Sequence, residues 1–128
     1  MNRILNQEMI QDFINSYNIG DIINDETLDK VQLYRFDKGE CICSNGDTLM
    51  QLYFLVKGKL KIYTTLENGR SFLLRFYKPL SVVGDIELLH DYKVKFNVES
   101  VTESYLLAID FEAIKKYSYD DPIFLRFI

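Results

Sequence analysis

The sequence predicts a mainly β protein: an antiparallel β-roll with an N-terminal helix and further helices at its C-terminal end. Three observations lead to this fold class. Glycines recur at near-regular spacing between residues 39 and 84, short apolar runs fill the intervals, and the apolar period changes from helical to strand-like near Leu33. Glycine adopts positive φ without steric cost, so glycines spaced in this way mark tight turns between short strands.

The first predicted element is an amphipathic helix over residues 3–18, where apolar residues recur three and four positions apart with polar residues between them. Gly20 is placed to end this helix. Asp25 can cap a second, short helix that carries Leu28 and Val31 on one face.

Residues 33–109 predict strands and turns, with one short helix after Gly84. The clearest pair of strands flanks Asn68-Gly69, a dipeptide that favours a two-residue hairpin loop. With that loop, Ile62 faces Arg75, and the same register pairs Leu60 with Tyr77 and Thr64 with Leu73. One face of the hairpin is then apolar except for a single arginine.

Two helices are predicted near the end of the chain. Asp110 can cap a helix from Phe111 to Tyr117, and Asp121-Pro122 is a second helix start, since proline fits the first helical position. The residues after Pro122 are strongly apolar, so we expect this last helix to need a partner surface.

The overall composition fits one globular domain of 128 residues with a formal net charge of −4. No broad basic face for nucleic acid, secretory signal or membrane-length apolar stretch is present in the sequence. We expect a cytoplasmic chain with no membrane partner. Cys41 and Cys43 fit a reducing compartment as ordinary strand cysteines, because a bridge between residues two apart on a strand would be strained.

Several segments together resemble the effector domain of the cyclic-AMP receptor protein and fumarate-nitrate regulator family of bacterial transcription factors, over roughly residues 33–128. The matching segments are Gly39-Glu40, Ile42, Gly46-Asp47, Tyr53-Phe54-Leu55-Val56, Gly58, Gly69 and Gly84-Asp85. The resemblance implies a double-stranded β-helix, related to cupin jelly rolls. It also implies a division into a β-roll sensor domain with its N-terminal helices at 1–120 and the start of a dimerisation helix at 121–128, without the helix-turn-helix that follows in the family.

In that family a cyclic nucleotide binds at a short cassette whose helical turn and Arg-Ser pair hold the phosphate. Gly84-Asp85-Ile86 falls at the helical turn, with Asp85 in place of the glutamate that bonds the ribose hydroxyl. Val94-Lys95 falls in the Arg-Ser slot. Valine removes a phosphate clamp worth about 1.5–3 kcal/mol or more, so we expect an effector other than cyclic AMP.

Two further residues are candidates for contact with an effector. Arg75 is an alternative anion anchor if its face of the hairpin lines the roll; otherwise that face is the outer one, or Arg75 pairs with Asp85 or Glu87. Phe96 falls in the cassette and could fill or cover the pocket. The predicted ligand-binding residues are Gly84, Asp85, Ile86, Val94, Lys95, Phe96 and Arg75; the aromatic residues Tyr53, Phe54, Phe72 and Phe76 are expected in the core.

The function that the resemblance implies is a regulatory sensor domain, not an enzyme, that responds to a small-molecule effector. His90 is the one histidine, which argues against a metal-dependent cupin enzyme, and the identity of any cofactor or effector stays open. A homodimer is expected for the intact protein, with DNA contacted only through the missing C-terminal domain. The alternatives are a ligand-free roll that acts as a dimerisation or protein-interaction scaffold, and a cyclic-nucleotide module of a channel or kinase.

Overall fold

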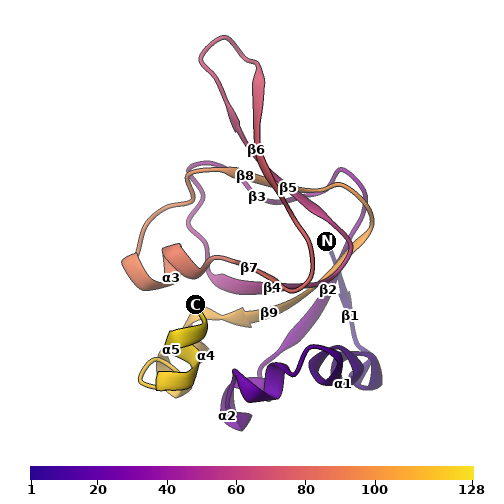
Figure 1. Cartoon of the computed structure of the whole chain (residues 1–128), viewed down its shortest axis with the longest axis vertical. Coiled ribbons are helices and arrows are strands. Elements are labelled where there is room, and N and C mark those ends of the chain that lie inside the picture. The colour runs from indigo at the N-terminus through magenta and orange to yellow at the C-terminus, as the bar shows by residue number, and fades with distance from the viewer.

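The computed structural model describes all 128 residues, and its strands form two antiparallel sheets that make up the roll (Figure 1). The five-stranded sheet has the order β1-β2-β9-β4-β7. Its strands are β1 (Asn2–Ile4), β2 (Gln32–Phe36), β9 (Ser104–Asp110), β4 (Gln51–Lys57) and β7 (Ser81–Val83). The four-stranded sheet, in the order β3-β8-β5-β6, contains β3 (Cys41–Cys43), β8 (Asn97–Ser100), β5 (Leu60–Thr65) and β6 (Ser71–Tyr77). The predicted mainly β class is confirmed.

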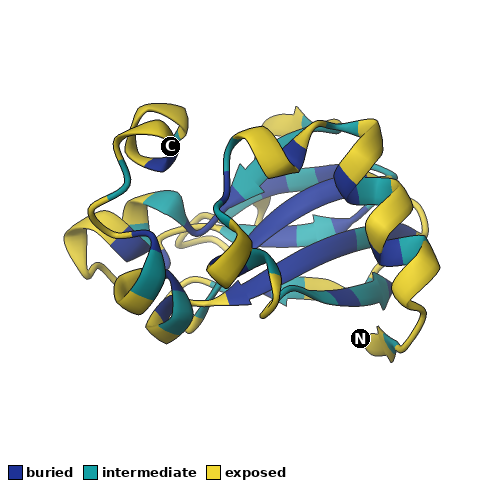
Figure 2. Cartoon of the chain, turned by 90° about the horizontal axis from the view of Figure 1, so that it is seen from below, coloured by how far each residue is buried: buried dark blue, intermediate teal, exposed yellow.

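Helices cover the outer face of the five-stranded sheet and one end of the roll (Figures 1 and 2). The helices are α1 (Gln7–Ser16), the 3₁₀ turn η1 (Ile19–Asp21), α2 (Asp25–Leu28), α3 (Asp85–His90), α4 (Phe111–Tyr117) and α5 (Pro122–Phe127). α3 lies at the open side of the roll, whereas α1, α2, α4 and α5 lie beneath the sheet (Figure 1). None of these helices has the length and apolar character needed to cross a membrane.

Strand β4 separates two apolar cores, because its alternate side chains point to opposite faces of the sheet. Leu52, Phe54 and Val56 pack into the core beneath the helices. Tyr53 and Leu55 pack into the core inside the roll. Burial on both faces explains why the sequence of β4 is an uninterrupted apolar run rather than an alternating one.

The N-terminal segment differs from its prediction at both ends of the helix. Residues 2–4 pair with β2 as a short strand, and α1 begins after Asn6, whose side chain accepts a hydrogen bond from the Met9 N–H at 3.0 Å. The helix ends near Ser16, where Asn18 rather than Gly20 adopts the left-handed conformation. The second helix is capped by Asn24, one residue before the predicted Asp25.

The β5–β6 hairpin is present, but its loop is longer than predicted. The Gly69 N–H donates to Leu66 O at 2.9 Å with Gly69 at positive φ, which makes a three-residue loop with a glycine bulge. Thr64 therefore faces Phe72 and not Leu73. A second irregularity at Leu74 restores the predicted register, so that Ile62 faces Arg75 and Leu60 faces Tyr77.

The same hairpin projects from the body of the molecule, so that most of β6 lies on the surface (Figure 1). Tyr53 and Phe54 are buried as expected, but Phe72 and Phe76 are 55% and 44% exposed, and their prediction as core residues is wrong. β6 is an edge strand of its sheet, and no helix covers it. An amphipathic strand pattern cannot reveal that the strand continues past the end of the core.

The two predicted C-terminal helices are confirmed as α4 and α5. Asp121 caps α5 by accepting from the Ile123 N–H at 3.0 Å, while the Asp110 carboxylate accepts from Gln51 instead of capping α4. Phe127 of α5 stacks on Phe54 with 5.9 Å between ring centroids. Asn24 ties α2 to this end of the chain by donating to Tyr117 O at 2.7 Å.

Candidate functional site

The site is built on Gly84, which turns the chain from β7 into α3. Its φ is +105°, and an added Cβ would lie 2.8 Å from Leu49 Cδ2 and 3.0 Å from Gln51 O. Both the conformation and the close approach therefore require glycine. α3 is fixed from the other side by Leu88, which is buried in the core beneath the helices.

A cavity of about 260 Å³ lies between α3, the interior of the roll and the segment that leads into β8. It is lined by Cys43, Ile62, Tyr77, Val82, Val83, Gly84, Asp85, Ile86, Glu87, Tyr92, Lys93, Val94, Lys95, Phe96 and Val98. Ten of these fifteen residues are hydrophobic. A volume of this size holds roughly nine water molecules at about 30 Å³ each, enough for a small metabolite.

The segment before β8 is held in place by the backbone of a neighbouring turn. The Val94 N–H donates to Asp47 O at 2.9 Å, and the Gly46 N–H donates to Val94 O at 2.7 Å. Val94 is buried and lines the cavity. The next two residues, Lys95 and Phe96, also line the cavity but are exposed. Val94, which the family resemblance places in the Arg-Ser slot, thus contributes an apolar side chain to the cavity wall.

Six of the seven predicted site residues line this cavity: Gly84, Asp85, Ile86, Val94, Lys95 and Phe96. Phe96 is 43% exposed and lines the cavity without filling its volume of about 260 Å³. Arg75 is not among the lining residues; it is exposed, and its guanidinium carbon lies 5.1 Å from the ring centroid of Tyr77. Arg75 makes no ion pair with Asp85 or Glu87, and the burial on which its anchoring role depended is absent.

The charged groups of the wall differ in their burial. Asp85 and Glu87, from the first turn of α3, are half-buried, whereas Lys93 and Lys95 are exposed. Burial raises the pKa of Glu87, and the nearby Asp85 charge raises it further. A hydrogen bond from the Glu87 backbone N–H acts in the opposite direction and lowers this pKa. The Lys95 ammonium lies 4.6 Å from the Tyr92 ring centroid.

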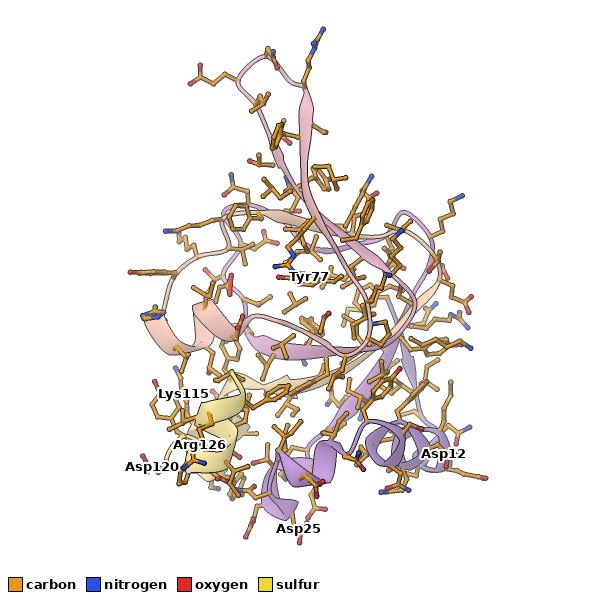
Figure 3. The ribbon with its side chains drawn as sticks, in the orientation of Figure 1. Asp12, Asp25, Tyr77, Lys115, Asp120 and Arg126 are labelled. Atoms are coloured by element: carbon orange, nitrogen blue, oxygen red, sulfur yellow. The ribbon has the colours of Figure 1, made fainter.

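Several lining residues were absent from the sequence prediction. Tyr77 points into the interior of the roll from the base of β6 (Figure 3). Ile62, on β5, also lines the cavity and lies opposite Arg75 of β6. The sequence pattern could have indicated that both residues line the cavity. Tyr77 is two residues from Arg75 on its strand, so the two side chains start from the same face of the hairpin. Cys43 also reaches the cavity, and burial raises the pKa of its thiol to about 12.

Other chemistry finds little support in the side chains of the site. His90, at the end of α3, is exposed and stacks on Tyr92 with 5.4 Å between ring centroids. Cys41 is also exposed, and the two cysteines are free. No three histidine, cysteine, aspartate or glutamate side chains are grouped in a way that could hold a metal ion. The site can enclose a small molecule between apolar, aromatic and charged walls.

Comparison with known proteins adds the following similarities. The regulatory protein YeiL of Escherichia coli O157:H7 is 28% identical over 95 residues, 74% of this chain and 43% of that protein. The CRP-like cAMP-activated global transcriptional regulator of Mycobacterium tuberculosis is 24% identical over 93 residues, 73% of this chain and 42% of that protein. The chain thus spans about two fifths of the length of these relatives.

A solved structure shares the fold: the sensor domain of the transcriptional regulator DNR from Pseudomonas aeruginosa superposes with a TM-score of 0.77 at 20% identity, covering 94% of this chain and 85% of that one. The model of the cyclic nucleotide-binding domain family matches residues 33–118. This range contains the whole cavity wall and all strands except β1 and the first residue of β2. The family resemblance in the sequence is therefore confirmed, and the chain belongs to the cyclic nucleotide-binding domain family.

Proposed function

We propose that the chain is the ligand-sensing regulatory domain of a transcription regulator of the cyclic-AMP receptor protein and fumarate-nitrate regulator type, and that its effector is not cyclic AMP. The observation that carries this proposal is the cavity beside α3, whose wall contains Val94, the residue that the resemblance places in the slot of the phosphate-binding arginine. Without the arginine clamp, the affinity of the site for a phosphate-containing ligand falls by about tenfold to a hundredfold.

The mechanism that we propose is a shift between two positions of α3. Asp85, Ile86 and Glu87 line the cavity, while Leu88 of the same helix is buried in the core that also contains Phe124 of α5. An effector that contacts α3 differently in two states would favour one of them, and Leu88 would carry that preference to α5. In this proposal residues 1–120 are the sensor and residues from 121 begin the dimerisation helix of a cytoplasmic, non-enzymatic homodimer.

The experiment is a gain of cyclic-AMP binding. The double variant V94R/K95S restores the Arg-Ser pair of the family at this position, and V94L/K95S is the matched control without the guanidinium. Isothermal titration calorimetry with cyclic AMP is expected to give at least tenfold tighter binding for the arginine variant than for the unmodified chain and the control. Equal binding of cyclic AMP by the unmodified chain would refute the proposed change of effector.

A second candidate function is a scaffold without a ligand, and the β5–β6 hairpin favours it. Its exposed large apolar residues are Leu66, Phe72, Leu73, Leu74 and Phe76. The hairpin from Lys57 to Lys78 also contains six of the 15 basic residues and one of the 19 acidic residues of the chain. A projecting apolar and basic strand of this kind is typical of an interaction surface.

The two candidate functions predict different effects of mutation on effector binding and on self-association. If the chain is a sensor, a side chain that fills the cavity, as in V94F, abolishes effector binding and leaves self-association as it was. If the chain is a scaffold, self-association measured by light scattering falls in F72S/F76S, and the cavity binds none of a panel of nucleotides, nucleosides, amines and small acids.

A further inference from the structure

The cavity wall carries two carboxylates that lack a cationic partner. Asp85 and Glu87 both line the cavity from the first turn of α3, and neither makes an ion pair within 4 Å with any lysine or arginine. A half-buried carboxylate loses hydration without receiving a charge in return. The raised pKa of Glu87, caused first by burial, reflects this cost.

The basic residues of the wall do not balance these carboxylates. Lys93 and Lys95 are exposed, and the Lys95 ammonium lies over the ring of Tyr92. Charges in contact with water are screened within about 8 Å at physiological salt, whereas charges in a partly desolvated wall act at lower effective dielectric. The two half-buried charged groups of the wall are therefore both negative, and its two positive groups are exposed.

The remaining wall suits the body of an organic molecule. Val83, Val94 and Val98 offer apolar surface, and three aromatic residues, Tyr77, Tyr92 and Phe96, also line the cavity. Aromatic faces attract cations through their negative quadrupole and also pack against hydrocarbon. A phosphate, in contrast, meets no arginine in this wall, and the two lysines that line it, Lys93 and Lys95, are exposed at its edge.

We propose that the cavity binds a small organic cation, an amine with an apolar body, whose ammonium group donates hydrogen bonds to Asp85 and Glu87 while its body lies against the valine and aromatic wall. This inference rests on the proposed function, because it names the ligand class of the same site. The ammonium supplies the partner that the two carboxylates lack, and its binding draws α3 toward the roll.

The test uses three probes of similar size that differ in charge: 2-phenylethylamine, 2-phenylethanol and phenylacetate. Each is titrated into the ¹⁵N-labelled chain at pH 7, and affinity is taken from amide shifts of residues 82–98. The amine is expected to bind at least tenfold more tightly than phenylacetate. The variants E87Q and D85N should each weaken amine binding about tenfold or more and leave phenylethanol binding unchanged.

The control variant is E112Q, which removes a carboxylate from α4, away from the cavity. It should bind the amine as the unmodified chain does, and circular dichroism verifies the fold of all three variants. Phenylacetate binding equal to or tighter than amine binding would overturn the inference and leave the proposed ligand cavity standing. Amine binding that E87Q and D85N do not weaken would also overturn it. Absence of shifts with all three probes would overturn the inference and count against the ligand cavity itself.

Discussion

Replacement of Gly58 by alanine tests how closely the β4–β5 turn packs against the start of β9. Gly58 has a φ of +103°, and an added Cβ would lie 2.7 Å from Glu103 O and 2.8 Å from Ser104 Cα, besides striking the Ser104 hydroxyl. The Lys59 N–H donates to that hydroxyl at 3.3 Å, and the Val101 N–H donates to Lys59 O at 2.8 Å. The turn cannot move away without loss of these hydrogen bonds.

Two costs add up in Gly58→Ala. A non-glycine residue at positive φ costs about 1–2 kcal/mol. Contact with backbone atoms, which cannot rotate away as a side chain can, adds about 1–3 kcal/mol of overpacking. The free energy of unfolding should therefore fall by about 2–5 kcal/mol, a large part of the ~5–15 kcal/mol that stabilises an ordinary domain.

The assay is urea unfolding followed by far-ultraviolet circular dichroism. With a slope of about 2 kcal/mol per molar urea, the midpoint should fall by about 1–2.5 M. Gly39→Ala is the matched control, because Gly39 also has positive φ, +83°, but nothing lies within 4 Å of its added Cβ. It should lose only about 1–2 kcal/mol. Equal losses for the two variants would refute the argument from close packing.

The remaining predictions concern single side chains. Iodoacetamide at pH 8 should modify exposed Cys41 but not Cys43 in the folded chain, since burial raises the Cys43 pKa to about 12; peptide mass mapping that finds equal labelling contradicts this. The raised pKa of Glu87 means that its protonated form favours folding below the ordinary value of 4.5 and that this contribution is lost as pH rises through the higher folded value. Glu87→Gln should therefore raise the melting temperature at pH 7 but not at pH 4; a lower melting temperature at pH 7 would contradict the prediction. Asn24→Ala should lower the free energy of unfolding by about 2 kcal/mol, because the cap to the Thr27 N–H and the hydrogen bond to Tyr117 O both disappear. Asn24→Asp should recover the cap alone. A free energy of unfolding unchanged in Asn24→Ala, measured by chemical denaturation, would rule this out.

Much of the fold could be predicted from the sequence because local and tertiary preferences agree. The glycines at 39, 46, 58, 69 and 84 all have positive φ, as turns between strands require. Gly84, Asp85 and Val94 could be predicted to lie beside one another because they are close together in the chain, whereas Cys43, Ile62 and Tyr77 reach the same cavity from distant strands. Asp121-Pro122 likewise starts a helix for local reasons, a side-chain cap and a fixed φ.

The sequence-based predictions are wrong where tertiary contacts, and not local sequence, determine the position of a residue. The register of the hairpin is correct at Ile62 and Leu60 only because a longer loop and a second bulge offset each other. Phe72 has the apolar character of a core residue, but the end of the core is set by the opposite sheet. Arg75 lies on the predicted face of its strand, yet its side chain turns to the Tyr77 ring at the edge of the roll and does not enter the cavity.

Strand β4 also brings the cavity and the last helix close together. Val83 in the cavity wall lies opposite Tyr53 in the register of β4 and β7, and the next residue along β4, Phe54, points to the other face of the sheet and stacks on Phe127. A single thickness of main chain thus divides the roll interior from α5. In the proposed mechanism, a measurement of the packing between the Phe54 and Phe127 rings would therefore report a movement of α5 from a point one strand away from the cavity.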